Sequence, residues 1–554
     1  MGRQRGSPQI PQGTWLLRGP PPDGRLPPLS HPLLPGRRLR APPHPRQPPG
    51  TVGESLRTTG DKPMTRFTPW KLTGLLTGLL VFTLLTTLDT PLKHYGDWGA
   101  RPAFAAGIAA LMAIWWLTEA LPIHLTACIP LLLFPATGVF GPGLDVNVTE
   151  SLQPYVDSYI FLFAGGMCIA AAMQQWDLHR RIALNIMRVI GTDPRHLLLG
   201  ILVATAFISL WISNSATATM MVSIGIALIA QLESLLGGRR LKHYGGSIML
   251  GIAYASNVGG IGTKIGTATN TLFCGFMERI GIEITFLKFM VVGFPFVVLF
   301  LPVVWLVLWR TGRADAPRED LGRAAIHEEI ARLGPIRRGE RVVLGVFCCT
   351  AGLWIAGKPI TDLLQAWVGA FKVASASIEA GIAVLAALVL LAYRVDGRQA
   401  LALRSIRRYV PWESLLLLGG SFAMASGIQK SGLSGWMGAQ LTVIRDFTPF
   451  SQVLMASFAT VALSAVASNV ATISVMANIL KDAVSGSHLT TVLFASAISA
   501  SCDFALPAGT PPNAIVFGSG YVTIPRMART GVLLDLLAAI LAACWCWIIV
   551  EWAI

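Results

Sequence analysis

The chain has 554 residues, of which 53% are hydrophobic and only 13% are charged. Soluble globular proteins carry about 25% charged residues, so this composition excludes an ordinary soluble fold. The net charge of +15 is also found in nucleic-acid-binding proteins, but much of it lies in an N-terminal tail and in short loops between apolar runs. Examples of these loops are "HRR" (179–181), "GGRRLKH" (237–243) and "RSIRR" (404–408). Basic loops of this kind are typical of the cytoplasmic side of membrane proteins, so we expect no nucleic-acid partner.

Residues 1–63 are rich in proline and arginine and contain no apolar signal-peptide core. Such a segment cannot bury a core, which predicts a disordered tail. Met64 begins "MTRFTPWKLTGLLTGLLVF", which is typical of a cytoplasmic start that leads into a first membrane span. We therefore interpret residues 1–63 as an upstream start-site artefact.

Long apolar runs recur from residue 70 onward, which predicts an all-α polytopic membrane protein. Two charge-free runs, Leu197–Leu232 and Phe447–Leu480, are each more than thirty residues long, whereas one helical span needs roughly 20. Each run carries polar residues near its middle, "SNS" at 213–215 and "SNV" at 468–470. Because unsatisfied polar groups are costly in a bilayer, these positions predict interrupted helices whose freed groups bind something.

The chain also reads as two copies, because three motifs recur in the same order at nearly the same offset. The offsets are 254 for Gly165 to Gly419, 255 for Ser213 to Ser468 and 243 for Thr267 to Thr510. We predict a first repeat over residues 64–309, a cytosolic connector over residues 310–341 and a second repeat over residues 342–554. Duplicated halves often insert with opposite orientations and form inverted repeats around a site at mid-membrane.

The broken segments offer two kinds of ligand. A half-helix that begins at a break presents free N–H groups and a positive dipole end to an anion, while unwound carbonyls can coordinate a small cation. The pairs Gly266-Thr267 and Gly509-Thr510 offer the same groups on neighbouring segments. Polar residues can instead serve only as contacts between helices, but two copies of two motif types favour a binding site.

These motifs resemble those of the divalent anion:sodium symporter (DASS) family. The stretches that carry the resemblance are "SNSATATMM", "SNVATISVM", "GTATN" and "LPAGTPPNAIVFGSGYV", and it covers about residues 70–552. The resemblance implies an elevator-type secondary carrier of di- or tricarboxylates such as succinate, malate, fumarate or citrate, coupled to sodium. It further implies a homodimer in the cytoplasmic (inner) membrane, with a scaffold domain, a transport domain and two re-entrant hairpins. We assign these hairpins to the segments at Gly165-Gly166 and Gly419-Gly420.

The resemblance also implies roles for single residues. The substrate-binding candidates are Ser213, Asn214, Ser215, Thr267, Ser468, Asn469, Thr510 and Pro511. One sodium site would involve Ser209, Ser213, Asn214 and Gly266, and its twin would involve Ser464, Ser468, Asn469 and Gly509. Neither motif pair contains Arg or Lys, so neutral donors and sodium ions must balance the charge of the anion. We expect no cofactor beyond these coupling ions.

Departures from the family pattern raise further hypotheses. Val470 replaces a hydroxyl-bearing residue, which predicts fewer hydrogen bonds to one carboxylate and a changed anion preference. Lys264 and Asp503 are charged residues in predicted membrane segments, and such residues are functional candidates. We hypothesise that Lys264 supplies positive charge near the first cation site, with Asp503 as its partner; alternatively, Lys264 reaches water and Asp503 faces a cavity. We interpret the lone His124 as a packing residue or as one that is hydrogen-bonded to a neighbouring helix, rather than as a proton relay.

Three other functions remain open at this stage. On the same fold, the protein could be a sodium-independent exchanger, a proton-coupled carrier or a symporter of an inorganic oxyanion such as sulfate. An intramembrane enzyme is disfavoured, because the sequence contains no HExxH, GxSxG or P-loop motif. A channel would not need two similar half-sites with broken helices.

Overall fold

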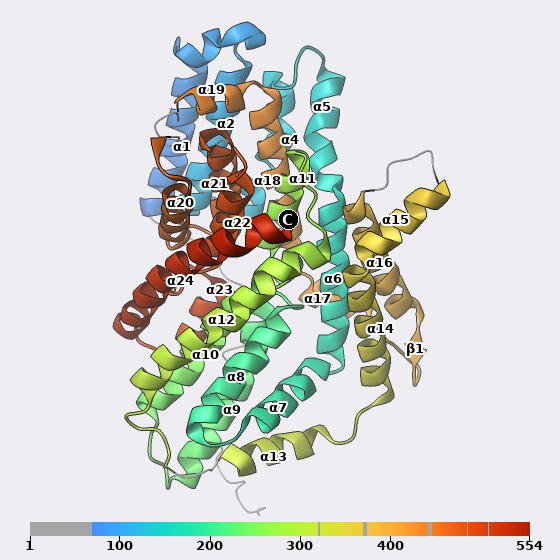
Figure 1. Cartoon of the computed structure of the whole chain (residues 1–554), viewed down its shortest axis with the longest axis vertical. Coiled ribbons are helices and arrows are strands. Elements are labelled where there is room, and N and C mark those ends of the chain that lie inside the picture. Colours follow the sequence, from blue (N-terminus) through green and yellow to red (C-terminus); the bar gives the residue numbers. More distant parts are fainter. Residues whose placement is uncertain (1–68, 319–321, 369–373, 441–445, 485, 508) are drawn as a thin grey trace, which may run out of the picture. The chain divides into compact units, whose positions relative to one another are not determined.

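A computed structural model describes residues 69–318, 322–368, 374–440, 446–484, 486–507 and 509–554, all of which belong to the unit Phe67–Ile554. The predicted tail, residues 1–63, lies outside the described residues, so its disorder and its start site stay predictions. The described part is almost entirely helical (Figure 1).

The elements up to residue 312 are mostly apolar helices with short connections. They are α1 (Pro69–Thr87), η1 (Pro91–His94), η2 (Gly96–Trp98), α2 (Arg101–Thr118), α3 (Ile123–Thr126), α4 (Ile129–Thr137), α5 (Leu144–Leu152), η3 (Gln153–Val156), α6 (Ser158–Gln175), α7 (Leu178–Ile190), α8 (Pro194–Ser209), α9 (Asn214–Leu235), α10 (Lys242–Gly260), α11 (Ala268–Arg279) and α12 (Phe286–Gly312).

The remaining elements include one short antiparallel strand pair, in which Arg394 is aligned with Gln399. They are α13 (Gly322–Leu333), α14 (Arg338–Ile355), α15 (Gly357–Val368), α16 (Ser375–Ala392), β1 (Arg394–Val395), β2 (Arg398–Gln399), α17 (Leu403–Tyr409), α18 (Trp412–Lys430), α19 (Leu433–Gln440), α20 (Pro449–Ser464), α21 (Asn469–Ala483), α22 (Leu489–Ala500), α23 (Pro511–Phe517) and α24 (Ile524–Ala553).

Seven helices among the described residues are long and apolar enough to cross a membrane, or up to eight if a bent pair at α14 and α15 counts as one span. Other apolar helices are too short. For example, α8 has 16 residues and is about 24 Å long at ~1.5 Å per residue, less than the ~30 Å hydrocarbon core. The chain is therefore a multi-pass membrane protein that also contains apolar helices too short to cross the bilayer alone.

The first of the two long charge-free runs forms a hairpin of helices. The start of α8 lies beside the start of α10, where the Tyr244 hydroxyl donates to the Pro194 carbonyl at 2.6 Å. The end of α8 lies beside the end of α10, where Ser209 Oγ is 2.6 Å from the Ser256 carbonyl. Helices α8 and α10 therefore run in the same direction.

Helix α9 runs in the opposite direction and packs against α10. A methyl group on Gly260, at the end of α10, would lie 2.2 Å from Asn214 Oδ1 at the start of α9. A methyl group on Gly245, near the start of α10, would lie 3.4 Å from Ile229 near the end of α9. The turn at residues 210–213 is thus the tip of a re-entrant hairpin rather than a kink in one span.

The second charge-free run folds in the same way. At one end of α20, Gln452 Oε1 lies 3.1 Å from His488 Nε2, just before α22. At the other end, the Ser464 hydroxyl donates to the Ala500 carbonyl at 2.7 Å. Helix α21 packs against α22 and is joined to it by a short connection, so it runs back from the tip at residues 465–468. Figure 1 shows α8 and α9 in the lower part of the view and α20 and α21 in the upper part.

These hairpins correct the assignment made from the sequence. Helices α6 and α18, which contain Gly165-Gly166 and Gly419-Gly420, are each continuous. Their glycines allow close packing instead: a methyl group on Gly165 would lie 2.6 Å from the Cβ of Ala383, and one on Gly420 would lie 2.2 Å from the Ala127 carbonyl. The assignment was wrong because a Gly-Gly pair permits a tight helix contact as readily as a turn.

Each hairpin is followed by a broken helix that extends toward the other repeat. The break at residues 261–267 separates α10 from α11, and the break at residues 501–510 separates α22 from α23. Helix α11 packs against α21 and α22, with the rings of Phe273 and Phe494 4.7 Å apart, whereas α23 packs against α9 and α10. The second half of each broken helix therefore packs against the hairpin of the other repeat.

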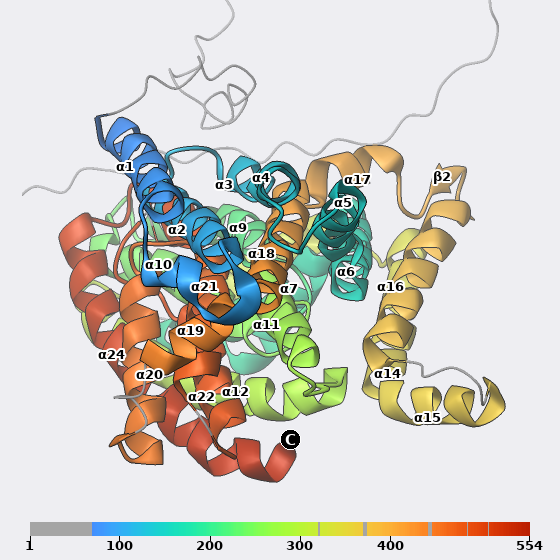
Figure 2. The same cartoon turned by 90° about the horizontal axis from the view of Figure 1, so that it is seen from above.

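The helices group into two sets by their contacts. The hairpins, the broken helices, α12 and α24 pack on one another, whereas α6 packs extensively against α16, and α14 packs against α16. Figures 1 and 2 both show α14, α15 and α16 beside α6 and away from α20 and α24.

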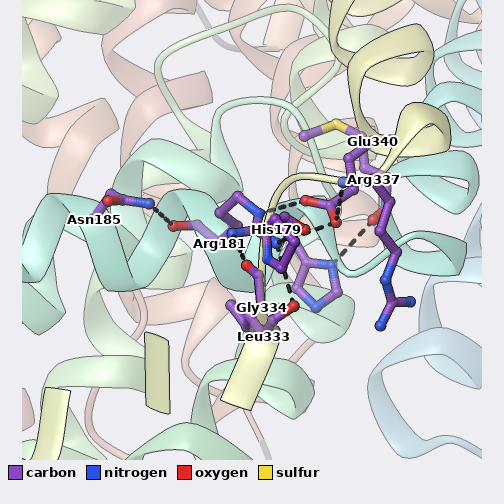
Figure 3. Close-up of polar contacts among 9 residues, drawn as sticks. His179, Arg181, Asn185, Leu333, Gly334, Arg337 and Glu340 are labelled. Atoms are coloured by element: carbon purple, nitrogen blue, oxygen red, sulfur yellow. Dashed lines mark hydrogen bonds and ion pairs between the residues drawn. The ribbon is translucent and has the colours of Figure 1, made fainter. Parts of the chain in front are cut away.

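An ion pair and hydrogen bonds tie part of the predicted connector to the first repeat (Figure 3). Arg181 on α7 binds the buried carboxylate of Glu340 on α14 and donates to the Gly334 carbonyl at 3.0 Å. Two residues earlier, burial lowers the pKa of His179, whose Nδ1 donates to the Met173 carbonyl at 3.2 Å. Helix α13 lies within the predicted connector and packs against α7 and α9. The boundaries of the predicted domains stay predictions.

Candidate functional site

A pocket of about 240 Å³ lies where the two hairpin tips meet the two broken helices. All eight substrate-binding candidates line it, namely Ser213, Asn214, Ser215, Thr267, Ser468, Asn469, Thr510 and Pro511. Gly509 lines it as well. The two hairpin tips, which are 255 residues apart along the chain, thus contribute to one pocket. The two Gly-Thr pairs, which are 243 residues apart, contribute to it as well.

Four helices begin at this pocket. Ser213 and Ser468 precede the first residues of α9 and α21, and Thr267 and Thr510 precede those of α11 and α23. Each of the four has extended backbone angles, such as φ −139° and ψ 149° at Thr267. The first turn of a helix presents unpaired N–H groups and the positive end of the dipole. Pro511 and Pro512 leave the start of α23 without such donors, but the starts of α9, α11 and α21 make the pocket suited to an anion.

The two hairpin tips repeat one hydrogen-bond pattern. Ser209 Oγ lies 3.0 Å from Asn214 Oδ1, and Ser464 Oγ lies 3.2 Å from Asn469 Oδ1. Ser209 and Ser464 are fully buried and stand behind the tips rather than in the pocket. Each serine therefore orients the asparagine that follows it by five residues, and the duplication seen in the sequence extends to individual side-chain contacts.

Two asparagines that the sequence analysis did not single out hold the breaks together. Asn270 Nδ2 donates to the carbonyls of Gly260 at 2.8 Å and Thr263 at 2.7 Å. Asn513, at the equivalent position, donates from Nδ2 to the carbonyls of Asp503 at 3.2 Å and Leu506 at 3.0 Å. Both lie at the end of the quoted motifs "GTATN" and "GTPPN", so the repeat itself was the signal that could have found them.

Gly266 lies in the first break, at the position equivalent to Gly509. A methyl group there would lie 2.4 Å from the Gly260 carbonyl, so only glycine fits. Asn257 was also missed: it lines the pocket and donates from Nδ2 to Thr510 Oγ1 at 3.0 Å. It thereby links the first broken helix to the second.

The remaining pocket wall comes from α3, α6 and α18. Among the described residues that line the pocket, none is Lys or Arg, and the titratable side chains are His124 and Glu413. His124 Nδ1 lies 3.8 Å from Glu413 Oε2. His124, interpreted from sequence as a packing residue or one hydrogen-bonded to a neighbouring helix, thus lines the pocket and lies near Glu413 on α18, to which no motif pointed.

Lys264 does not pair with Asp503, which corrects the hypothesis made from the sequence. Its ammonium lies 2.7 Å from Oε2 of Glu379 on α16, and both side chains are fully buried. The other carboxylate oxygen, Oε1, accepts a hydrogen bond from the Phe286 amide at 2.7 Å. Lys264 therefore neither reaches water nor lines the pocket, and its charge is compensated within the protein.

Asp503 lies in the second break, directly behind the pocket wall. It is fully buried, and a methyl group on Gly509 would lie 1.7 Å from its Oδ2. Asp503 does not line the pocket itself. Its carboxylate is packed against one of the residues proposed from sequence to hold a sodium ion.

The fold and the pocket define the class first: a multi-pass helical membrane protein with two similar half-sites around one anion-compatible hollow. The family model described as the sodium:sulfate symporter transmembrane region matches residues 79–553, and the chain belongs to this family. This membership confirms the resemblance to divalent anion:sodium symporters.

Similar proteins include the sodium-dependent dicarboxylate transporter SdcS of Staphylococcus saprophyticus, with 35% identity over 482 residues, covering 85% of this chain and 89% of that protein. SdcS of Staphylococcus aureus strain MRSA252 is 34% identical over 481 residues, covering 85% and 90%. The crystal structure of the YdaH transporter of Alcanivorax borkumensis, described as having an unusual topology, has a TM-score of 0.52 at 14% identity. It covers 76% of this chain and 97% of that chain, and it is similar in fold alone.

Proposed function

We propose that this protein is a secondary active transporter that couples sodium to the movement of di- or tricarboxylate anions across the cytoplasmic membrane. The observation that carries the proposal is the pocket itself, where helices from both repeats begin and to which no described Lys or Arg contributes. The names of the SdcS relatives, sodium-dependent dicarboxylate transporters, agree with it.

The anion would be held by neutral donors. The first turns of α9, α11 and α21 supply N–H groups, and hydroxyl groups such as those of Ser213, Thr267 and Ser468 add side-chain donors. Fixed dipoles of this kind favour an anion without the desolvation cost of a buried cationic side chain. A dianion nevertheless carries more charge than dipoles offset, so bound cations are needed beside it.

Sodium would bind behind each hairpin tip. For the first site, we propose the oxygens of Ser209, Ser213, Asn214 and Gly266, and for the second those of Ser464, Ser468, Asn469 and Gly509. Amide, hydroxyl and carbonyl oxygens are ligands that hard cations prefer. Because each site includes residues that also line the pocket, cation binding would organise the anion site and couple the two. No further cofactor is required.

The movement would be of the elevator type, with the two repeats inserted in opposite orientations. The hairpins, the broken helices, α12 and α24 would form the transport domain, and α6, α14, α16 and α18 would belong to the scaffold of a homodimer. Two features support this division: α6 and α14 both pack against α16, and the pocket is lined by Phe163 and Leu417 on one side and by the hairpin tips on the other.

Uptake by purified protein in liposomes tests the proposal. Radiolabelled succinate, malate, fumarate, citrate and sulfate are each offered with an inward sodium gradient, with sodium on neither side, and with internal unlabelled anion. Sodium-driven accumulation of a dicarboxylate is expected. Equal uptake without sodium in the preloaded vesicles would identify an exchanger, sodium-driven uptake of sulfate alone would identify an oxyanion symporter, and either would refute the proposal.

Asparagine variants connect the activity to the pocket. Asn214→Ala and Asn469→Ala each remove a side chain at a hairpin tip, and we expect the catalytic efficiency of uptake to fall about 10- to 100-fold, since an unsatisfied partner costs roughly 1–3 kcal/mol. Asn478→Ala is the matched control: Asn478 is buried on α21 but outside the pocket, and it donates only to the Ser474 carbonyl at 2.7 Å. Uptake that falls equally in all three variants would point to a folding defect instead.

A further inference from the structure

The two breaks differ at one equivalent position. With the offset of 243 residues that relates Thr267 to Thr510, Gly260 in the first repeat corresponds to Asp503 in the second. The backbone agrees with this equivalence, because Asn270 and Asn513 donate to the carbonyls of Gly260 and Asp503 respectively. The second repeat therefore carries a carboxylate where the first has no side chain.

The first repeat indicates where such a side chain points. A methyl group on Gly260 would lie 2.2 Å from Oδ1 of Asn214, the asparagine of the first hairpin tip. Asn469 occupies the corresponding place in the second repeat. A side chain at position 503 therefore projects toward the region between the break and the hairpin tip, where the second cation is proposed to bind.

The Asp503 carboxylate is fully buried and nearly without partners. Apart from a weak contact with the Ala505 amide, neither of its oxygens has a hydrogen-bond partner among the residues that the structure describes. No ion pair within 4.0 Å involves Asp503 in that part of the chain. A buried carboxylate without a partner is costly, so this group calls for a positive charge.

Neighbouring polar groups also favour a positive charge near the Asp503 carboxylate. Oδ1 of Asn257 and Oδ1 of Asn513 are also buried without partners among the described residues, while both amide nitrogens donate to the Asp503 carbonyl. Asp535 on α24 is a second buried acid, and it accepts from the Phe504 amide at 2.9 Å. At the first break, by contrast, Lys264 is already neutralised by Glu379. The excess of negative charge is thus confined to the second break.

We propose that the Asp503 carboxylate is a direct ligand of the cation at the second break, so that the second half-site binds its cation through a full negative charge and the first does not. The inference rests on the proposed sodium-coupled function. A single carboxylate with neutral oxygens is suited to a monovalent hard cation such as sodium, and the described residues contain no group of three His, Cys, Asp or Glu that could hold a metal ion. The second cation would then bind to the carrier before the anion does.

Sodium binding to the purified full-length protein without any anion tests this inference. Binding of radioactive sodium is measured for the parent and for Asp503→Asn, which keeps the size of the side chain and removes its charge. Removing a group that only hydrogen-bonds to a metal ligand typically lowers metal affinity by about 10- to 100-fold. Because Asp503 is proposed to be a ligand itself, we expect the half-saturating sodium concentration to rise at least about tenfold. Asp535→Asn is the matched control: because the Phe504 amide already donates to this carboxylate, we expect a much smaller change in sodium binding than for Asp503→Asn. If Asp503→Asn does not fold, Asp503→Ser, which is smaller, has the same expected result.

The outcomes separate this inference from the proposed function. A parent that binds sodium and drives uptake with it, with no change in Asp503→Asn, would overturn the inference and leave the function intact. An equal loss in Asp535→Asn would also overturn it, because any buried acid would then produce the effect. A parent that neither binds sodium nor shows sodium-dependent uptake would refute the proposed function as well.

Discussion

The buried ion pair between Lys264 and Glu379 makes a sharp prediction about stability. The pair joins the first break to α16 and is withdrawn from water on both sides. In Glu379→Gln, the amide oxygen can still accept from the Phe286 amide, as Oε1 does at 2.7 Å. The amide nitrogen then faces Lys264, so two donors oppose each other and the ammonium is left without an acceptor.

The magnitude follows from this geometry. The pair distance is 2.7 Å and both side chains are fully buried, so the ammonium cannot recover its hydration, and the Tyr159 ring, 5.4 Å away, compensates only weakly. Removing one partner of a buried ion pair typically costs about 3–5 kcal/mol, whereas replacing both by neutral groups is often nearly neutral. We therefore expect Glu379→Gln to lose about 3–5 kcal/mol of stability and the double variant with Lys264→Met to regain most of it.

Thermal unfolding in detergent measures the effect. A thiol-reactive dye reports unfolding once the exposed Cys348 and Cys349 are replaced by serine in every variant, because Cys274, Cys502 and Cys546 are buried in the folded protein. Asp362→Asn is the control: its exposed pair with Lys358, 3.0 Å long, should contribute only about 0–1 kcal/mol. A melting temperature of Glu379→Gln equal to that of the parent, or a double variant as unstable as the single one, would refute the reasoning.

Two other predictions concern the tips and the helix contacts. Val470→Thr restores a hydroxyl at the second tip with little change in shape, and we expect a several-fold lower KM for dicarboxylate uptake, since one hydrogen bond contributes about 0.5–1.5 kcal/mol; an unchanged or higher KM would contradict the role given to this position. Gly420→Ala should lower the melting temperature markedly, because its methyl group would lie 2.2 Å from the Ala127 carbonyl. Gly381→Ala on α16, which has open space around it, should not lower it, and equal effects in both variants would argue against the helix contact.

The sequence by itself determined the membrane class, the duplication and the positions of the breaks. Polar residues in the middle of over-long apolar runs predict where a helix must stop, because a break in the bilayer is tolerated only where the freed backbone groups find partners. The structure begins α9 at Asn214 and α21 at Asn469, inside the two motifs. The length of an apolar run and the polar residues within it are local properties of the sequence, and the repeat shows both in each half of the chain.

Only the tertiary structure decided which way the chain turns at each break and which residues meet. An over-long apolar run can contain either a kink or a reversal of the chain. The sequence therefore could not show that the hairpin turns lie at residues 210–213 and 465–468 rather than at the Gly-Gly segments. The partner of Lys264 is 115 residues away on another helix, and nothing local to either residue pointed to the other. Charge pairing in a bilayer depends on which helices touch, and that depends on packing over the whole chain.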